Sequence, residues 1–141
     1  MKFSLVPYGS VHTVTPSLMT FLLKSEMWTA GRAHVDDILA FVYSGRMQLW
    51  IFHDEPITQV SGFVITEIKD YPRKKVLVMQ YCASLTHMVN DVGPMAFKIL
   101  ERYAKDGDCN GMEFFGRPGW MKTAKTLGFK TQTVVYDKFW S

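Results

Sequence analysis

The chain has 141 residues, of which 48% are hydrophobic and 14% aromatic, with a formal net charge of +3. This length suits one domain with a sizeable core, and the aromatic content excludes a disordered chain. The basic residues are dispersed, which argues against a nucleic-acid binder. No run approaches the roughly 18 apolar residues of a membrane span, and the first residues lack the apolar core of a signal peptide. We therefore expect one cytoplasmic domain, residues 1–141, without nucleic-acid or membrane partners.

The first third of the chain predicts one strand and two helices. Residues 2–7 have the composition of an opening strand. Thr15 and Pro16 supply an N-cap and a first-turn proline, and apolar residues at helical spacing follow, which predicts a helix over 16–27. A second helix is predicted over 34–43, because acidic residues fill its first turn and a glycine follows its end.

The middle of the chain predicts three strands and a longer helix. Residues 48–53, 58–69 and 75–83 are rich in β-formers and are separated by turn residues, which indicates an antiparallel meander. Gly62, inside the second of these strands, indicates either a gap in side-chain packing or a bulge. The apolar positions from Val92 onward follow helical spacing and predict a helix over 90–105.

The last third of the chain predicts a strand, a short helix and a final extended segment. Gly107 is expected to end the preceding helix, and residues 112–115 form a compact apolar run. Pro118 suits the first turn of a short helix, and Gly128 supplies its positive-φ stop. Residues 130–140 are expected to run as a last strand. The resulting order, β-α-α-β-β-β-α-β-α-β, indicates an α+β fold.

This order resembles that of the GCN5-related N-acetyltransferase (GNAT) superfamily, and the resemblance covers essentially the whole chain. It implies a GNAT-like fold, with a mixed, mostly antiparallel sheet of about six strands flanked by about four helices. Within it, some segments look like small GNAT-like proteins of tailed bacteriophages and prophages. These segments are Leu49-Trp50, Val64-Ile-Thr-Glu-Ile68, Tyr71-Pro72, Leu100-Glu101, Cys109 and Gly116-Arg-Pro-Gly-Trp120.

The resemblance implies acetyl-CoA as the cofactor. GNAT enzymes cradle its pyrophosphate with backbone N–H groups of a Gln/Arg-x-x-Gly-x-Gly/Ala loop at a helix N-terminus, which aligns here with residues 88–93. Backbone groups at the end of the preceding strand would bind the pantetheine arm and polarise the thioester oxygen. The implied cofactor-binding residues are Tyr81, Cys82, Ala83, Asn90, Val92, Gly93 and Arg117.

The aligned loop departs from the GNAT pattern. Met88 replaces the polar first position, and Asp91 replaces a glycine, so that a carboxylate stands where the pyrophosphate would approach. Asn90 or Asp91 is alternatively the N-cap of the following helix. Arg117 would pair with a phosphate or a carboxylate, or would be a solvated surface residue.

Two glutamates are candidate catalytic residues. A glutamate on the central strands is the usual general base of the superfamily, which points to Glu67 and Glu113. Strand alternation also allows either one to be an ordinary surface or edge residue. Glu67 is preferred, because the strands around it splay open on the acceptor side in GNAT folds. Ala124 occupies the position of the usual tyrosine acid, so a proton for the leaving thiolate would come from water or from a neighbouring Cys or Tyr.

No metal is expected, because the four histidines are scattered and the two cysteines form no CxxC. Both cysteines are expected to be reduced and largely buried. The leading hypothesis is an acetyl-CoA-dependent N-acetyltransferase of phage type, acting on an amine of a small molecule or a protein. The alternative is a catalytically inactive GNAT-fold phage protein that acts as a virion-associated, structural or host-interaction component, located in the bacterial cytoplasm or in the virion.

Overall fold

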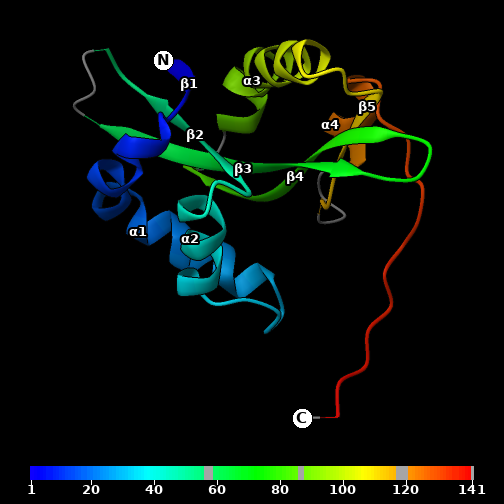
Figure 1. Cartoon of the computed structure of the whole chain (residues 1–141), viewed down its shortest axis with the longest axis horizontal. Helices are drawn as coiled ribbons and strands as arrows, with labels where there is room; N and C mark the ends of the chain where they lie inside the picture. Colours follow the sequence, from blue (N-terminus) through cyan, green and yellow to red (C-terminus); the bar gives the residue numbers. More distant parts are fainter. Residues whose placement is uncertain (56–58, 86–87, 117–120, 141) are drawn as a thin grey trace.

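The structure, a computed structural model, describes residues 1–55, 59–85, 88–116 and 121–140, without the side chains of residues 88–90. Figure 1 shows a twisted sheet with α1 and α2 on one face and α3 on the other. The elements in chain order are β1 (Lys2–Leu5), the 3₁₀ turn η1 (Tyr8–Ser10), α1 (Val11–Trp28), α2 (Val35–Tyr43), β2 (Gln48–His53), β3 (Val60–Asp70), β4 (Lys75–Ser84), α3 (Met88–Asp106), β5 (Gly111–Phe114) and α4 (Met121–Thr126).

The strands form one mixed sheet in the order β1-β2-β3-β4-β5. The first four strands pair antiparallel with their sequence neighbours, as the predicted meander requires. β5 pairs parallel with β4, because α3 carries the chain back across one face of the sheet before β5 begins. The predicted α+β class and mostly antiparallel sheet are confirmed, with five strands in the described chain where about six were expected.

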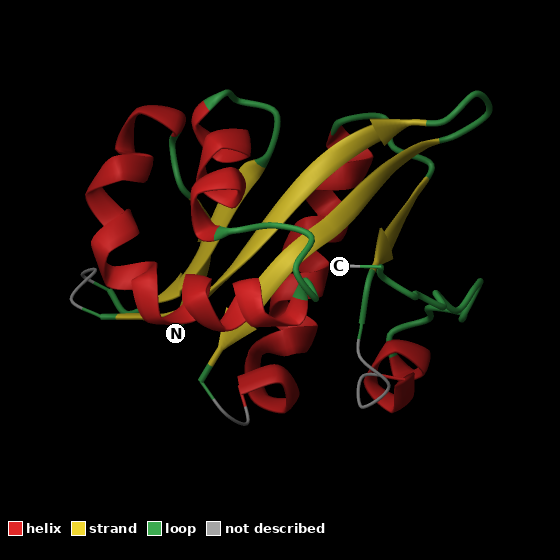
Figure 2. Ribbon diagram, turned by 90° about the horizontal axis from the view of Figure 1, so that it is seen from below, coloured by secondary structure: helices red, strands yellow, loops and turns green. Residues whose placement is uncertain are grey.

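The sheet separates two hydrophobic cores, and Figure 2 shows α1 and α2 side by side over one face. The first core packs this helical layer against the sheet and is centred on Leu18, Leu22, Ile38, Phe63 and Ile65. The second core packs α3 against the opposite face and is centred on Trp50, Val64, Leu77, Ala96 and Leu100. Strand alternation explains the division, since Phe63 and Ile65 face one core and Val64 faces the other.

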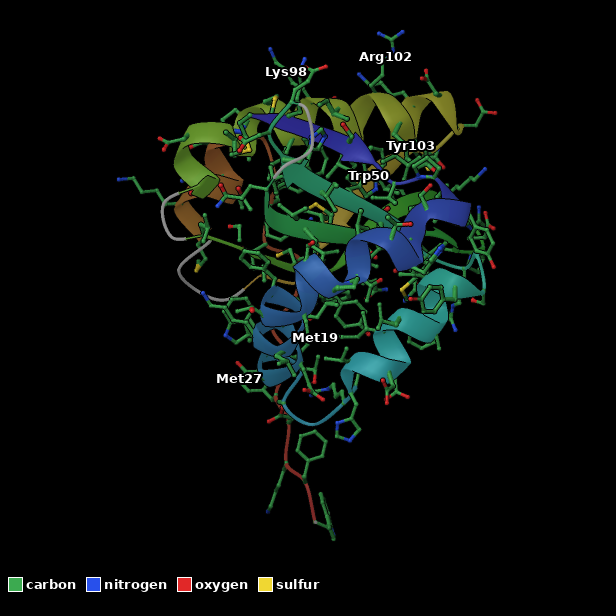
Figure 3. All side chains as sticks on the ribbon, turned by 90° about the vertical axis from the view of Figure 1, so that its left-hand side faces the viewer. Met19, Met27, Trp50, Lys98, Arg102 and Tyr103 are labelled. Atoms are coloured by element: carbon green, nitrogen blue, oxygen red, sulfur yellow. The ribbon has the colours of Figure 1, made fainter. Side chains whose placement is uncertain are left out.

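The second core contains a short chain of hydrogen-bonded polar side chains among its aromatic side chains. Trp50 stacks on Phe3 and meets the edge of Tyr103 of α3, with ring centroids 5.1 Å apart in the latter pair, and Figure 3 shows Trp50 and Tyr103 together beneath α3. The Trp50 indole N–H donates to Thr66 Oγ1 at 3.0 Å, and the Thr66 hydroxyl donates to Gln48 at 2.9 Å. These bonds satisfy the polar atoms that the core buries.

Helix α1 begins earlier than predicted. It starts at Val11, with Ser10 as its N-cap, so Pro16 lies inside the helix and Thr15 is not the cap. The Thr15 hydroxyl donates instead to the carbonyl of Val11 at 2.8 Å. Pro16 has no backbone N–H, so the carbonyl of His12 lacks its usual helical hydrogen-bond donor. His12 is exposed, so water can reach this carbonyl. Burial of Val11 in the first core therefore outweighs the proline signal.

Helix α3 ends one residue later than predicted. The left-handed residue is Asp108, with φ 60°, rather than Gly107. The N–H groups of Asp108 and Cys109 donate to the carbonyls of Lys105 and Ala104 at 3.1 and 2.9 Å, which is the Schellman pattern. Asp tolerates this conformation better than most residues because its short side chain bonds locally.

The predicted stop of α4 at Gly128 is confirmed. Gly128 has φ 89°, and the N–H of Phe129 returns to the carbonyl of Ala124 at 2.9 Å. The ring of Phe129 then packs on Phe97 of α3 and Phe114 of β5, with centroids 5.5 and 5.0 Å apart. Pro118, expected in the first turn of this helix, lies outside the described residues.

Gly62 lies beside a bulge and at a close approach of two strands, so of the two expectations the bulge is confirmed and the packing gap is wrong. The register shifts between Phe52 and His53, so that Ser61 is an extra residue next to Gly62. A Cβ atom added at Gly62 would lie 2.6 Å from the carbonyl oxygen of Ala83 and 2.7 Å from Cβ of Ser84. Any side chain here would force β3 and β4 apart.

The expected last strand is not formed. Residues 130–140 have no strand assignment and are exposed throughout. Figure 1 shows this segment, in red, running from the α4 end of the molecule past the α1–α2 layer. We call residues 130–140 the C-terminal arm. A strand exists only where an edge pairs with it, and in this chain the arm leaves the edge of β5.

Candidate functional site

The two halves of β4 have different neighbours. β5 pairs with β4 only from Val76 to Met79, whereas the pairing of β4 with β3 continues as far as Ser84. Within the described residues, the second half of β4 therefore has one edge without a strand partner. The structure places Tyr81, Cys82 and Ala83 on this half. We call residues 80–84 the open edge of β4. Alternate residues of such an edge direct both N–H and C=O outward, ready to bind an extended ligand.

A bulge at Gln80 marks the start of the open edge. Ile65 pairs with Tyr81 and Thr66 pairs with Met79, so Gln80 has no partner of its own on β3. A bulge of this kind turns two consecutive side chains toward the same face. Accordingly, Gln80 Nε2 donates to Glu67 Oε1 at 3.2 Å, and the adjacent Tyr81 packs against the first core.

Glu67 lies on the first-core face of β3 and is 4% exposed. The Arg46 Nε donates to Glu67 Oε2 at 2.6 Å, and Gln80 occupies the other oxygen. The Arg46 guanidinium also lies over the Phe41 ring, 4.9 Å from its centroid. Burial of a carboxylate requires such partners, and together they fix its position. Arg46 and Gln80 thus occupy two of the lone-pair positions of the Glu67 carboxylate.

Glu113 lies on the same face as Glu67, two strands away. Val78 is the register partner of Glu67 on one side and of Glu113 on the other. Two strand spacings separate the Cα atoms of the glutamates by about 10 Å. The Tyr71 hydroxyl donates to Glu113 Oε1, and this bond is the main cause of the raised pKa of Tyr71. The structure thus brings both predicted glutamates to one side of the sheet, with Glu113 the more accessible.

Tyr81 adds a proton donor to this face. Burial raises the pKa of its hydroxyl, and the negative charge of Glu67 raises it further, while Arg46 acts in the opposite direction. The phenol therefore keeps its proton at neutral pH. The bulge at Gln80 decides the face to which the Tyr81 side chain points, so the sequence alone indicated only a role for the Tyr81 backbone.

The segment aligned with the pyrophosphate motif, residues 88–93, lies wholly inside α3, which begins two residues earlier than predicted. α3 begins at Met88, so Val92 and Gly93 fall beyond its first turn. Only the first N–H groups of a helix lack an internal acceptor, and these belong to the residues up to Asn90. Asp91 is exposed in the first turn, where the helix dipole favours a carboxylate. Asn90 and Asp91 therefore do not cap the helix.

Arg117 lies outside the described residues. The neighbouring Ala124 lies half-buried on α4 and offers no acid group. Cys82 and Cys109 are thiols of intermediate exposure, and burial raises the pKa of the Cys109 thiol. In the part of the chain that the structure covers, no three potential metal ligands cluster.

Arg46 and Gln80 were not predicted as site residues from the sequence. Arg46 reaches Glu67 only because α2 ends beside the sheet, and no local pattern encodes that contact. Gln80 did carry a signal, since it is a lone amide in the otherwise apolar run of β4.

No helix among the described residues is long and apolar enough to cross a bilayer.

No family model matches the sequence, and no curated protein does. Solved structures do match over nearly the whole chain. An aminoglycoside N-acetyltransferase in complex with CoA has a TM-score of 0.72 at 16% identity, covering 99% of this chain and 95% of that one. A ribosomal-protein-alanine N-acetyltransferase from Brucella melitensis biovar Abortus 2308 has a TM-score of 0.70 at 11% identity, covering 99% and 100%.

Glucosamine-6-phosphate N-acetyltransferase from Arabidopsis thaliana has a TM-score of 0.69 at 10% identity, covering 99% of this chain and 98% of that one. At such low sequence identities, the similarity shows a shared fold and nothing more. The chain thus has the α+β fold of the GNAT acetyltransferases, as its sequence predicted.

Proposed function

We propose that the chain is an acetyl-CoA-dependent N-acetyltransferase whose acceptor is an amine. The observation that supports this proposal is that the pairing of β4 with β5 ends at Met79, beside the buried carboxylate of Glu67. An open strand edge offers the alternating donors and acceptors that the two amides of a pantetheine arm require. The proposal is supported by the shared fold of an N-acetyltransferase in complex with CoA.

Acetyl-CoA supplies a thioester, from which the acetyl group passes to the amine. Glu113 accepts the proton of the attacking amine, because its carboxylate is accessible and holds a donor only from Tyr71 among the described contacts. Tyr81 gives a proton to the departing sulfur as the C–S bond breaks and the C–N bond forms. Glu67 is a positioning residue, because Arg46 and Gln80 bind it and Gln80 starts the open edge.

The first N–H groups of α3 would hold the pyrophosphate, as helix N-termini hold anions. Asp91 opposes this binding by placing a negative charge in the same turn. This one observation favours the second candidate, a GNAT-fold protein without cofactor that serves as a virion-associated or host-interaction component. The phage origin of either candidate is our proposal from the resemblance of segments such as Val64–Ile68 and Leu100–Glu101 to small phage proteins.

Titration with acetyl-CoA separates the two candidates. A ligand that binds only the folded chain stabilises it by about 2.7 kcal/mol at a hundredfold excess over its dissociation constant, which raises the melting temperature. No shift at millimolar acetyl-CoA would contradict the enzyme proposal and favour the second candidate.

The role of Glu113 is tested by acetyl transfer to a panel of primary amines. Glu113→Gln should lower kcat by about 10²–10⁴-fold and remove the acidic limb of the pH profile, with acetyl-CoA binding retained. Glu101→Gln, on the exposed face of α3, is the matched control and should leave kcat unchanged. A normal pH profile in Glu113→Gln would show that Glu113 is not the base.

A further inference from the structure

A cavity of about 460 Å³ lies at the β1 edge of the sheet, and we call it the β1 cavity. Its walls come from β1, the η1 turn, the first turns of α1, the middle of β2 and the start of β3. β1 and β5 are the two outer strands of the sheet, and Figure 1 shows them on opposite sides of the molecule. Three strand spacings, or about 14 Å, separate β1 from the open edge of β4. The cavity is therefore distinct from the site described above, and its volume suits a small organic ligand.

A serine and a histidine are hydrogen-bonded at the wall of the β1 cavity. Ser4 lines the cavity, and its Oγ lies 2.8 Å from Nε2 of His53. Ser4 pairs with Ile51 across the two strands, and His53 follows Ile51 by two residues on β2, so all three side chains project from one face. The two residues lie 49 positions apart in the chain, so no local sequence motif indicates their contact.

The backbone next to His53 determines which ring nitrogen carries the proton. Nδ1 of His53 lies 2.7 Å from the carbonyl oxygen of Asp54, and a carbonyl oxygen can only accept, so Nδ1 is the donor. Nε2 of the neutral ring is then an acceptor, and the Ser4 hydroxyl donates to it. The ring is only 6% exposed, so water does not compete for these two bonds. A serine hydroxyl that donates to an oriented histidine is the arrangement of an activated nucleophile.

Polar groups of α1 face the same cavity. Ser10 is the N-cap of α1, but its side chain makes no capping bond, so the first N–H groups of the helix receive no side-chain acceptor from it. The hydroxyls of Ser10, Thr13 and Ser17 line the cavity and have no hydrogen-bond partner among the described residues. Donors of this kind, at the positive end of a helix, stabilise a negatively charged oxygen that develops during a reaction.

The rest of the lining defines the class of ligand. The other described lining residues are mainly apolar, and none of the described lining residues carries a charged side chain. The apolar ones are Leu5, Val6, Pro7, Val14, Ile51 and Val60. A charged ligand would lose its hydration here without gaining an ionic partner. The cavity therefore selects an uncharged ligand with a short apolar group.

We propose that Ser4 and His53 form a second catalytic site, which hydrolyses uncharged esters of short carboxylic acids. Ser4 Oγ attacks the carbonyl carbon as its proton passes to His53 Nε2, and His53 returns that proton to the alcohol oxygen as the ester C–O bond breaks. Water then attacks the acyl group on Ser4 and gives a proton to His53. The acid leaves as Ser4 Oγ recovers this proton from His53. The inference does not depend on acetyl-CoA binding.

Hydrolysis of 4-nitrophenyl acetate and 4-nitrophenyl butyrate by the full chain tests the proposal. His53→Gln should lower kcat/KM by about 10²–10⁴-fold, because it removes the general base, and Ser4→Ala should lower it at least as much. Ser44→Ala is the matched control, since this serine is exposed at the end of α2, and it should leave the rate unchanged. A wild-type chain without hydrolysis, or Ser4→Ala with the wild-type rate, would overturn the proposal.

Covalent labelling identifies the nucleophile. Diisopropyl fluorophosphate should phosphorylate Ser4 with loss of fluoride, and mass spectrometry of the peptides should find the label there and not on Ser44. A label absent from Ser4 at millimolar reagent would also contradict the proposal.

An introduced thiol tests the role of His53 without requiring ester hydrolysis. Ser4→Cys places a thiol beside Nε2 of His53, and this thiol should react with iodoacetamide at least about tenfold faster than Cys82 or Cys109, because a neighbouring base promotes the thiolate. Melting curves check that each variant is folded. A folded Ser4→Cys variant whose new thiol reacts no faster than the two natural cysteines would show that His53 does not activate this position.

Discussion

At the scale of single residues, the sequence predicts features that depend on local backbone geometry. Gly128 ends α4 as expected, because a left-handed turn at a helix end selects glycine. The same rule placed the end of α3 at Gly107, whereas Asp108 takes the left-handed position. The contact of Arg46 with Glu67 could not be predicted, since Arg46 lies 21 residues away in the chain and meets it only through tertiary packing.

His34 makes the stability of the chain depend on pH. Its Nδ1 lies 2.8 Å from Glu26 Oε1, and the pKa of the ring is raised above 6.5 by this hydrogen bond first, then by the charges of Glu26, Asp37 and Asp36. A pKa raised by folding means that the protonated ring stabilises the fold below pH 6.5, and that this contribution is lost as the pH rises through the folded pKa.

The prediction is checked by melting curves from about pH 5.5 to pH 8. His34→Asn retains a residue suited to the N-cap of α2 but does not titrate in this range. The melting temperature of the wild-type chain should fall relative to that of His34→Asn as the pH rises. Parallel pH dependence of the two proteins would show that the ion pair with Glu26 contributes nothing measurable.

At the scale of elements, hydrophobic periodicity predicted the order of helices and strands as far as α4. Hydrophobic periodicity did not predict the register irregularities between strands. The bulge at Gln80 turns Gln80 and Tyr81 toward one face, and a one-residue slip of this kind is set by contacts with β3 rather than by the run of β-formers in β4. Pro16 shows the same limit in a helix, because burial of Val11 extends α1 beyond the predicted start.

The close approach of β3 and β4 at Gly62 predicts a large effect of a single methyl group. Gly62→Ala should lower the free energy of unfolding by about 2 kcal/mol or more, because the new Cβ would overlap the backbone of Ala83 and Ser84. Urea unfolding measures the change. Gly111→Ala is the matched control on β5, where an added Cβ meets nothing within 4 Å, and it should alter stability little. Equal effects of both variants would contradict the close approach.

At the scale of the whole molecule, the fold is predictable from the sequence although the cofactor loop is not. The predicted order of strands and helices resembles that of the GNAT superfamily, and solved N-acetyltransferases share this fold with the chain at 10% to 16% identity. The final strand was expected from its composition, but strand formation also requires an edge, and the arm runs away from β5. The pyrophosphate segment, residues 88–93, was expected to span the start of a helix predicted over 90–105, whereas α3 begins at Met88 and includes all of it.

The central claim is that the open edge of β4 binds the pantetheine arm of acetyl-CoA. Hydrogen exchange of the backbone amides of β4, with and without saturating coenzyme A, tests it most directly. We predict slower exchange for the amides of residues 80–84 that face the open edge, while those of Val76 to Met79, already beside β5, should change little. Unchanged exchange across residues 80–84 at millimolar coenzyme A would contradict the claim.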